Sequence, residues 1–440
     1  MTFKPLHPVK LIKLTIKLSL YILLLFLNNT ARAVPGFARQ TGMSCMACHS
    51  VFPELTSFGR QFKLDGYTLT GMKTIESRSD SGKITMLKML TTMPFSVMIQ
   101  TSATHISKDL EGTQNNSVAL PQQLSMFFAG EVTPHIGTFM QVTYDGEGFG
   151  MDNADIRYAN RTNIGETGLA YGINLNNNPT VQDLWNSTPA WGFPFASPDA
   201  APGPAKSTFI QNQGSQVAGL GIYTLINNFL YAEATVYRTA QIGADNPADS
   251  SNSMVIKGIS PYWRLALQHQ WASNYIELGT FGMTANTYLS GISGNRSDFT
   301  DVGFDLQYEH QLTIGLFSIH SAFINEAENR DSPLSGEKTT LNFNSFNING
   351  NLYLKNGVGA TMGYFATSGT ADPLTVASLN NKPNSSGFIF QLQYLPWYNT
   401  KFALQYTLYN KFDGGTNNYD GSGRSMTDNN MLYLLTWFNF

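Results

Sequence analysis

From residue 84 onward the sequence is a long series of short segments in which apolar and polar side chains alternate. Typical segments are 95–102, 229–237 and 388–395, each rich in aromatic and β-branched residues and bounded by Gly, Asn or Asp. Charged residues make up only 13% of the chain and aromatic residues 12%. No stretch after Val34 is apolar enough for a membrane helix. Low charge, many aromatic residues and no hydrophobic helix, in a chain that also carries the export signal described below, are typical of a transmembrane β-barrel.

The predicted strands number roughly sixteen, an even count that suits a bacterial barrel. They begin near residues 94, 123, 135, 151, 166, 216, 229, 260, 274, 298, 313, 339, 357, 385, 401 and 430. The expected fold is therefore mostly β, an outer-membrane antiparallel β-barrel over residues 84–440. A soluble β-sandwich or propeller is the alternative. Two features argue against it: the sequence has no internal repeat, and its last residues have the pattern of a terminal barrel strand, described below.

The N-terminus predicts export. Four lysines precede an apolar run of ten residues, Leu18 to Leu27, and Ala31-Arg32-Ala33 supplies the small residues that a signal peptidase reads. Residues 1–33 are expected to be a cleaved signal peptide, because the run is too short for a membrane anchor of roughly 20 residues. Removing its five basic residues from the 27 of the whole chain leaves 22 against 30 acidic ones. A mature charge near −8 argues against nucleic-acid binding and favours cations.

The last ten residues, 431–440, read as a terminal strand that ends in Phe440. Leu432, Leu434 and Phe438 share one register, as the lipid-facing residues of a last barrel strand do. Leu435 and Trp437 are apolar in the other register, and we expect them to pack against something in the lumen.

One connection, residues 176–213, is too long for a tight turn, and it is rich in Trp, Phe and Pro. It is either an extracellular loop or a loop folded into the lumen, where it would narrow the pore or cover a cofactor.

The motif that carries chemistry is Cys45-Met46-Ala47-Cys48-His49. C-x-x-C-H is the attachment pattern of one covalent c-type haem. Cys45 and Cys48 would form the thioether bonds, and His49 would be the proximal ligand of the iron. A thioredoxin-like redox pair needs a βαβ unit and a zinc site needs two further ligands, and the sequence offers neither nearby.

Residues 34–83 around this motif form a small, partly α-helical c-type cytochrome segment. Apolar side chains recur at roughly helical spacing between Pro53 and Leu64, which predicts a helix there. About 50 residues build little core alone, so a haem would supply the missing apolar mass. Its expected neighbours are Phe52, Leu55, Phe58, Phe62 and Tyr67.

The second axial ligand is expected to be a methionine, which raises the reduction potential relative to histidine. Met72, Met86, Met89, Met93 and Met98 all lie downstream within reach. Of these, Met72 and Met93 are the candidates we favour for the distal ligand. The remaining histidines are not spaced like metal ligands, and none belongs to a second C-x-x-C-H motif, so one haem is expected.

Acidic residues gather at Glu131, Asp145, Glu147, Asp152 and Asp155. Their simplest role is to line a polar lumen and solvated turns. The functional alternative is a cation path or an Fe(II) encounter site, because carboxylate oxygens suit such an ion.

The run from Val34 to Tyr67 resembles the N-terminus of the fused outer-membrane monohaem cytochrome–porins of iron-oxidising bacteria. The similarity is carried by FARQTG, the C-x-x-C-H motif, and the FGR triplet and the FK and GY pairs that follow it. It extends more loosely to 151–159 and 177–185. The resemblance implies that Cys45, Cys48 and His49 hold the haem. It also implies an oxidoreductase of the Fe(II):cytochrome c reductase type in the outer membrane, with the haem segment in the barrel lumen or at its mouth.

The function expected from these features is transfer of electrons from extracellular Fe(II) through one haem c to a periplasmic c-type cytochrome. Two alternatives stay open: a general electron conduit with another donor or acceptor, and a solute porin with a structural or sensory haem.

Overall fold

The computed structural model describes residues 35–69, 74–76, 88–90, 93–112, 115–144, 146, 148–198, 201–240, 254–289, 291–331 and 337–440. Pro35–Phe440 forms one compact unit, separate from Met1–Val34. The predicted signal peptide lies outside the described residues. Among the helices of the described ranges, none has the length and apolar character needed to cross a membrane.

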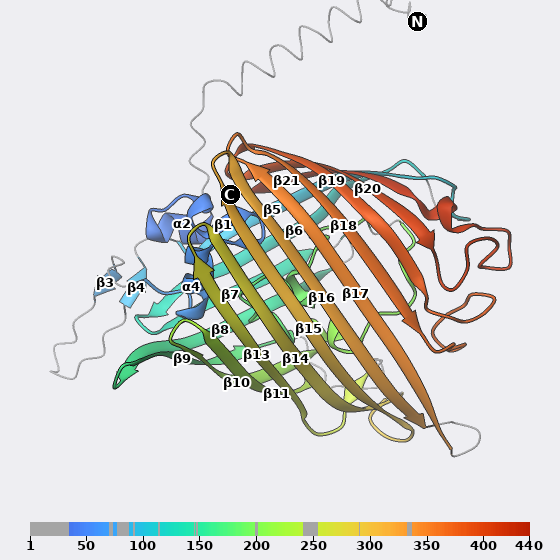
Figure 1. The fold of residues 1–440 in the computed structure, drawn as a ribbon, viewed down its shortest axis with the longest axis horizontal. Helices are drawn as coiled ribbons and strands as arrows, with labels where there is room; N and C mark the ends of the chain where they lie inside the picture. The colour runs from blue at the N-terminus through green and yellow to red at the C-terminus, as the bar shows by residue number, and fades with distance from the viewer. Residues whose placement is uncertain are drawn as a thin grey trace, which may run out of the picture. The chain divides into compact units, whose positions relative to one another are not determined.

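The wall of the fold is a closed antiparallel β-barrel (Figure 1). Its strands are β5 Phe95–Ile106, β6 Ser117–Thr133, β7 Ile136–Tyr144, β8 Phe149–Ile164, β9 Thr167–Asn176, β10 Val217–Ile226, β11 Leu230–Thr239, β12 Val255–Ile256, β13 Ser260–Trp271, β14 Asn274–Tyr288, β15 Arg296–Leu312, β16 Gly315–Asp331, β17 Lys338–Leu354, β18 Val358–Gly369, β19 Ser385–Trp397, β20 Thr400–Lys411 and β21 Met431–Asn439. β21 pairs with β5 and closes the ring.

The described wall has 16 strand positions, because the short β12 shares a position with β13 between β11 and β14. The predicted barrel is therefore confirmed. Most strands begin within two residues of the expected positions. The exception is β6, which begins at Ser117 rather than near residue 123, because Pro121 interrupts the alternating pattern inside a strand that continues through it.

Side chains alternate across the wall, as a strand period of two requires. On β13, Leu265 and Leu267 point outward and are about half exposed, whereas Arg264 and Ala266, which alternate with them, are buried inside. The outward residues form an apolar surface of the kind that faces lipid. The inward residues are mostly polar or charged, so the lumen is lined by hydrogen-bonding groups.

The terminal strand β21 follows its predicted register. Leu432, Leu434 and Phe438 are exposed on the outer face. Leu435 and Trp437 are buried on the inner face, in a cluster with Met98 against which Phe52 and Phe195 pack. The expectation that the second apolar register packs inside the lumen is confirmed.

The strands are joined by short turns at one end of the barrel and by longer connections at the other. β15 and β16 are joined by 313–314 and β19 and β20 by 398–399, whereas 370–384 and 412–430 connect strands at the opposite end. The C-terminus lies at the short-turn end, beside the first residues of β5 (Figure 1).

The described parts of the long connection, 177–198 and 201–216, fold into the lumen. Trp185 is fully buried, and its indole Nε1 donates to the hydroxyl of Tyr275 on β14 at 2.5 Å. Asp183 lies 3.3 Å from Arg264 on the inner wall. The segment also carries two short 3-10 turns, Pro189–Trp191 and Ile210–Gln213. Of the two expectations for this connection, the inward fold is the one observed.

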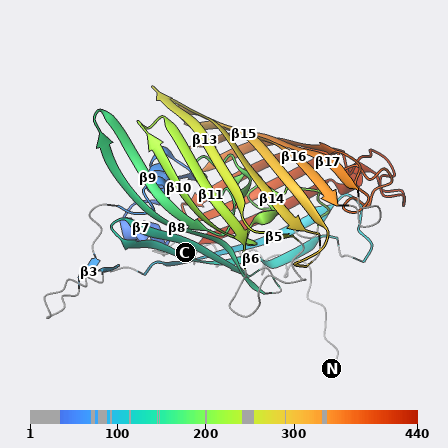
Figure 2. The same cartoon turned by 90° about the horizontal axis from the view of Figure 1, so that it is seen from below.

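The N-terminal part of the unit contains α2 Gly36–Thr41, α3 Cys45–Cys48, β1 His49–Val51, β2 Glu54–Leu55 and α4 Ser57–Leu64. A further pair, β3 Thr74–Glu76 and β4 Lys88–Leu90, forms a separate two-stranded sheet that is not part of the barrel wall (Figure 1). Both views show α2 and α4 at the end of the barrel where the C-terminus lies (Figure 2).

The helix expected from Pro53 to Leu64 begins later than the spacing suggested. Pro53 and Glu54 belong to a tight β1–β2 hairpin, in which Val51 pairs with Glu54. The helix begins only at Ser57, where the side chain of Thr56 accepts a hydrogen bond from the Gly59 N–H and caps the helix.

A charge on the outer face should destabilise the barrel. Phe304, midway along β15, is 57% exposed on that face. We expect Phe304→Arg to lower the free energy of unfolding in lipid vesicles by about 2–4 kcal/mol, because an arginine would enter the hydrocarbon layer. Denaturant titration measures this, with Phe304→Leu as the matched control. Equal stability of the two variants would show that this face does not meet lipid.

Candidate functional site

The two cysteines of the C-x-x-C-H motif lie in one helical turn, α3, which is held in place by Thr56, the cap of the next helix. In α3, the Ala47 carbonyl accepts a hydrogen bond from the Thr56 hydroxyl at 2.6 Å, and the Cys48 carbonyl accepts one from the Thr56 N–H at 2.9 Å. Gly59 allows this close approach, because a Cβ there would collide with the carbonyl oxygen of Cys48. The glycine of the FGR triplet is therefore needed to pack α4 against the cysteine turn.

The two cysteines form no disulfide, and they occupy different environments. Cys45 is buried and Cys48 is half-buried. Burial raises the pKa of Cys45, and it raises the pKa of Cys48 to about 11. A redox-active C-x-x-C pair has the opposite property, a thiol whose pKa is lowered toward neutrality. The two thiols are thus poorly suited to thioredoxin-like exchange.

The His49 imidazole is oriented by the β1–β2 hairpin. Its Nδ1 lies 3.3 Å from the carbonyl oxygen of Pro53, and its ring stacks at a tilt against Phe52 with centroids 4.8 Å apart. A proton on Nδ1 that donates to this carbonyl leaves Nε2 as the metal-binding nitrogen, as in many histidine-ligated sites. Burial lowers the pKa of His49 to about 4, so the ring is neutral at physiological pH.

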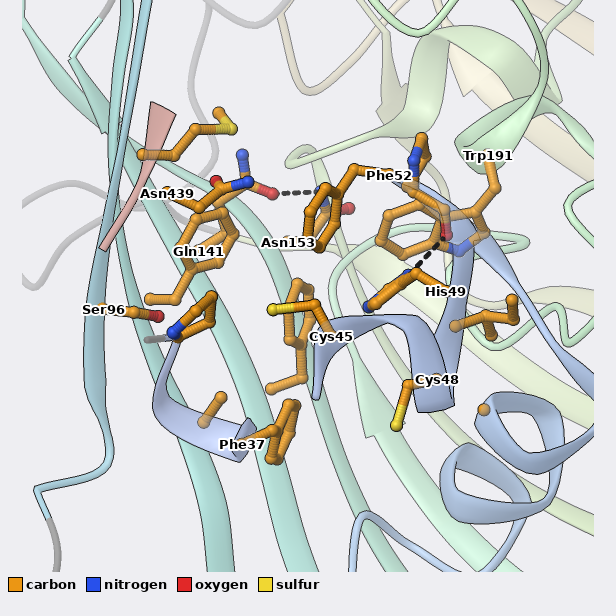
Figure 3. Close-up of a pocket in the computed structure, with 18 of the residues that line it drawn as sticks. Phe37, Cys45, Cys48, His49, Phe52, Ser96, Gln141, Asn153, Trp191 and Asn439 are labelled. Carbon is orange, nitrogen blue, oxygen red and sulfur yellow. Dashed lines mark hydrogen bonds between the residues drawn. The ribbon is translucent and has the colours of Figure 1, made fainter. Parts of the chain in front are cut away.

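A cavity of about 430 Å³ lies beside the two cysteines and His49 (Figure 3). This volume falls in the usual range for cofactor sites. The cavity draws residues from four parts of the chain, and most of its lining is apolar or aromatic. The N-terminal segment contributes Phe37 and Phe62, the inward connection Trp191 and Phe195, the first strands Met98 and Phe127, and the last strand Trp437.

Two cations of α4 anchor the N-terminal segment inside the lumen. The Arg60 guanidinium donates to both carboxylate oxygens of Glu309 on β15, at 2.6 and 3.1 Å. The Lys63 ammonium donates to the carbonyls of Val181 and Asp183 in the inward connection, at 2.6 and 2.7 Å. Burial lowers the pKa of Lys63 to about 7. These contacts fix α4 between the wall and the connection.

The end of the segment is fixed on the opposite side of the lumen. The Tyr67 hydroxyl donates to Asp155 on β8 at 2.6 Å, and Asp155 also pairs with Arg157 at 2.8 Å. The Arg157 guanidinium in turn donates to the Lys63 carbonyl at 3.3 Å. Gly66, with φ of 71°, adopts the left-handed conformation that makes this turn against β8.

Glu54 joins the β1–β2 hairpin to the far wall. Its carboxylate accepts hydrogen bonds from the Tyr353 hydroxyl at 2.9 Å and from the Asn351 amide at 3.2 Å. Burial raises the pKa of Glu54 to about 8. Sequence reasoning missed this residue, because its partners are almost 300 positions away.

Most of the aromatic and apolar neighbours expected around the motif do line the cavity. Phe52, Leu55, Phe62 and Tyr67 are among its lining residues, whereas Phe58 is not. Of the two favoured distal ligands, Met93 is 70% exposed and does not line the cavity, and Met72 lies outside the described residues. Met98 lines the cavity instead, and it is buried.

The acidic residues singled out in the sequence are dispersed. Asp152 lines the cavity, where its carboxylate accepts hydrogen bonds from Thr143 and Gln141 at 2.8 and 3.0 Å. Asp155 is paired with Arg157. Asp145 and Glu147 lie outside the described residues. Within the described ranges, no group of three or more His, Cys, Asp or Glu side chains could hold a metal ion.

Comparison with known proteins adds structural neighbours only. No family model matches the chain, and no curated protein matches it. The outer membrane channel DcaP of Acinetobacter baumannii is 12% identical over 79% of this chain and 96% of its own, with a TM-score of 0.48. OmpF of Salmonella typhi, in complex with daunomycin, is 10% identical over 79% and 98%, with a TM-score of 0.47. OmpT of Vibrio cholerae is 10% identical over 83% and 100%, with a TM-score of 0.44.

The described barrel and its apolar outer face define the class: an outer-membrane β-barrel with 16 strand positions. Unlike a bare pore, its lumen contains the N-terminal segment and the connection 177–216, which contact each other through Lys63.

The role of Gly59 can be tested by adding one methyl group. Gly59→Ala should push α4 away from the cysteine turn, and overpacking of this kind costs about 1–3 kcal/mol. We expect faster trypsin cleavage after Arg60 and Lys63, both buried in the native protein. Gly203→Ala is the matched control, because a Cβ there meets nothing within 4 Å. An unchanged cleavage rate in Gly59→Ala would contradict the packing argument.

Proposed function

We propose that this outer-membrane barrel transfers electrons through one covalent haem c held by Cys45, Cys48 and His49. Its donor would be extracellular Fe(II), and its acceptor a c-type cytochrome in the periplasm. The observation that carries the proposal is the aromatic-lined cavity beside the two cysteine side chains and the oriented imidazole of His49.

The residues present fit this cofactor. The single turn Cys45–Cys48 puts two thiols and the following imidazole within one cavity, as C-x-x-C-H attachment requires. The backbone carbonyl of Pro53 sets the histidine tautomer that can ligate iron through Nε2. The apolar lining, including Phe62 and Trp191, suits the faces of a porphyrin.

When bound, a haem supplies reversible one-electron chemistry whose potential depends on the axial ligands and on burial. The chain's own residues exclude water from the site and hold the cysteine turn in position. The aromatic lining excludes water from the site, and the Arg60–Glu309 pair holds α4, and with it the cysteine turn, against the wall. Fe(II) would lose its electron without forming a bond to any catalytic side chain.

The position of the site along the barrel supports delivery to the periplasm. In bacterial barrels the short turns face the periplasm and the longer loops face outward. The N-terminal segment is attached near the short-turn end: Gln40 donates to the Ala129 carbonyl, near the end of β6, at 2.7 Å, and Arg39 donates to the carbonyl of Phe95, the first residue of β5. A soluble acceptor on that side would meet the segment directly.

The other side of the cavity supports a route for a cationic donor. Its lining continues along the wall to Gln123, Gln141 and Asp152, toward the long-loop end of β6, β7 and β8. Carboxylate and amide oxygens are suitable ligands for a hydrated divalent ion. The acidic balance of the mature chain adds a favourable field for cations.

The resemblance to the cytochrome–porins gains support from the packing. Its three stretches, 34–67, 151–159 and 177–185, lie far apart in sequence but meet in the lumen. Tyr67 bonds to Asp155, and Lys63 bonds to the carbonyls of Val181 and Asp183. Residues of these three stretches thus take part in holding the segment in the barrel.

A solute porin with a structural haem is the second candidate, and the barrel architecture by itself favours it. The wall is closed, and its inner face is polar, with buried residues such as Gln393 and Gln405. The segment and the connection that occupy the lumen favour electron transfer over free diffusion of solutes.

The redox role can be tested by anaerobic titration. We expect the purified protein to carry covalent haem, and Fe(II) as the sole reductant to produce the reduced haem spectrum. Cys45→Ala/Cys48→Ala should lose the covalent haem, because no thioether can form, while Met93→Leu should retain it. A haem that stays oxidised in excess Fe(II) would eliminate the iron-oxidising role, and a protein without covalent haem would eliminate the cofactor.

The porin alternative can be tested by liposome swelling. Because the lumen is occupied, we expect vesicles that contain the protein to swell slowly in isosmotic arabinose, close to the rate of protein-free vesicles. An open porin in the same lipid is the positive control. Swelling as fast as that control would favour the solute porin.

A further inference from the structure

We propose that Met98, on the inner wall of β5, is the distal ligand of the haem iron. The inference rests on the proposed function and assigns its second axial ligand. The N-terminal segment supplies His49, and the barrel wall would supply the second ligand.

The position of Met98 in the wall is unusual for its strand. The even-numbered residues of β5 point into the lumen, and they are otherwise polar over 96–104: Ser96, Gln100, Ser102 and Thr104. Met98 is the thioether in this row, and only 3% of its surface is exposed. A methionine is not expected among the polar inward residues of this strand, so its presence must have a local cause.

Met98 faces the same cavity as the attachment motif. It lines the cavity together with Cys45, Cys48 and His49. Figure 3 shows Ser96, the previous inward residue of the same strand, across the cavity from Cys45 and His49. The wall and the motif thus approach the cavity from opposite sides, as two axial ligands must approach a haem.

Three other cavity residues with donor atoms, Lys63, Tyr67 and Met43, are engaged elsewhere or badly placed. The Lys63 ammonium is bound to two carbonyls, and the Tyr67 hydroxyl donates to Asp155. Met43 precedes Cys45 by two residues, too close to the attachment site to reach the other face, and it is partly exposed. Among the cavity residues that the structure describes outside the attachment motif, these assignments leave Met98 as the buried soft donor.

The Met98 sulfur also has a hydrogen-bond partner that is compatible with ligation. The Gln100 amide donates to it at 3.7 Å. A thioether sulfur has two lone pairs, so one can accept this weak hydrogen bond while the other binds iron. Hydrogen bonds to a ligand atom tune the metal to which it binds. Gln100 is therefore expected to orient the sulfur.

The competing explanation is that Met98 only fills space. It belongs to a buried cluster with Tyr433, Leu435 and Trp437, and methionine packs well in irregular gaps. Replacement by leucine distinguishes the two roles, because leucine keeps the apolar volume and removes the sulfur.

The test uses the full-length holoprotein in detergent or lipid. Met98→Leu should keep its covalent haem but lose the sulfur-to-iron charge-transfer band of the ferric state. Its ferrous haem should bind carbon monoxide, and its reduction potential should fall. Met98→His should restore a six-coordinate low-spin spectrum with a potential below that of the native protein, because histidine lowers the potential relative to methionine. The control variant Met93→Leu should match the native protein in all four measurements.

The outcomes separate this inference from the proposed function. A native protein with no covalent haem would overturn both. A native haem that lacks the sulfur-to-iron band, or a Met98→Leu variant that keeps the band and excludes carbon monoxide, would overturn the role of Met98 alone. If Met98→Leu fails to assemble, Met98→His carries the test: an unchanged potential in that variant would also overturn the assignment.

Discussion

Closure of the sheet is the constraint on which the rest of the structure depends. A ring of 16 strand positions encloses a lumen too wide for its own side chains to fill, and barrels of this size otherwise contain water. Here the segment 35–69 and the connection 177–216 enter that space, and buried charges set their positions. Arg60 pairs with Glu309, and Arg264 contacts Asp183, Glu277 and Asp305. Buried ion pairs add little net stability, but breaking one is costly, so these pairs allow few alternative arrangements.

The N-terminal segment is too short to build a core of its own, and the barrel wall supplies the apolar side chains that it lacks. Tyr67 stacks on Phe139 of β7 with ring centroids 6.2 Å apart, and Phe37 stacks on Tyr67 at 5.6 Å. The barrel supplies one side of the core, and the cysteine turn is packed from the other side by α4 through Gly59. A bound haem would complete this core rather than create it, which modifies the expectation that the cofactor supplies the missing apolar mass.

The strands could be located from the sequence because their signal is local: a period of two along the chain, interrupted by turn residues. The errors have local causes as well. Pro121 concealed the beginning of β6, and the helical spacing after Pro53 concealed a hairpin that precedes the Thr56 cap. Met98 was one of several methionines within reach of the motif, and chain distance could not rank them. The useful signal was its place in the otherwise polar inward row of β5.

The sequence by itself determined the alternating strands and the C-x-x-C-H motif of Cys45, Cys48 and His49, and it predicts an export signal at residues 1–33, because each is encoded within a few neighbouring residues. Only the tertiary structure decided which residues surround that motif. Met98, Trp191 and Trp437 line one cavity although hundreds of positions separate the first from the last. They meet because β21 closes the ring against β5 and the connection 177–216 folds inward, and neither event leaves a periodic pattern in the sequence.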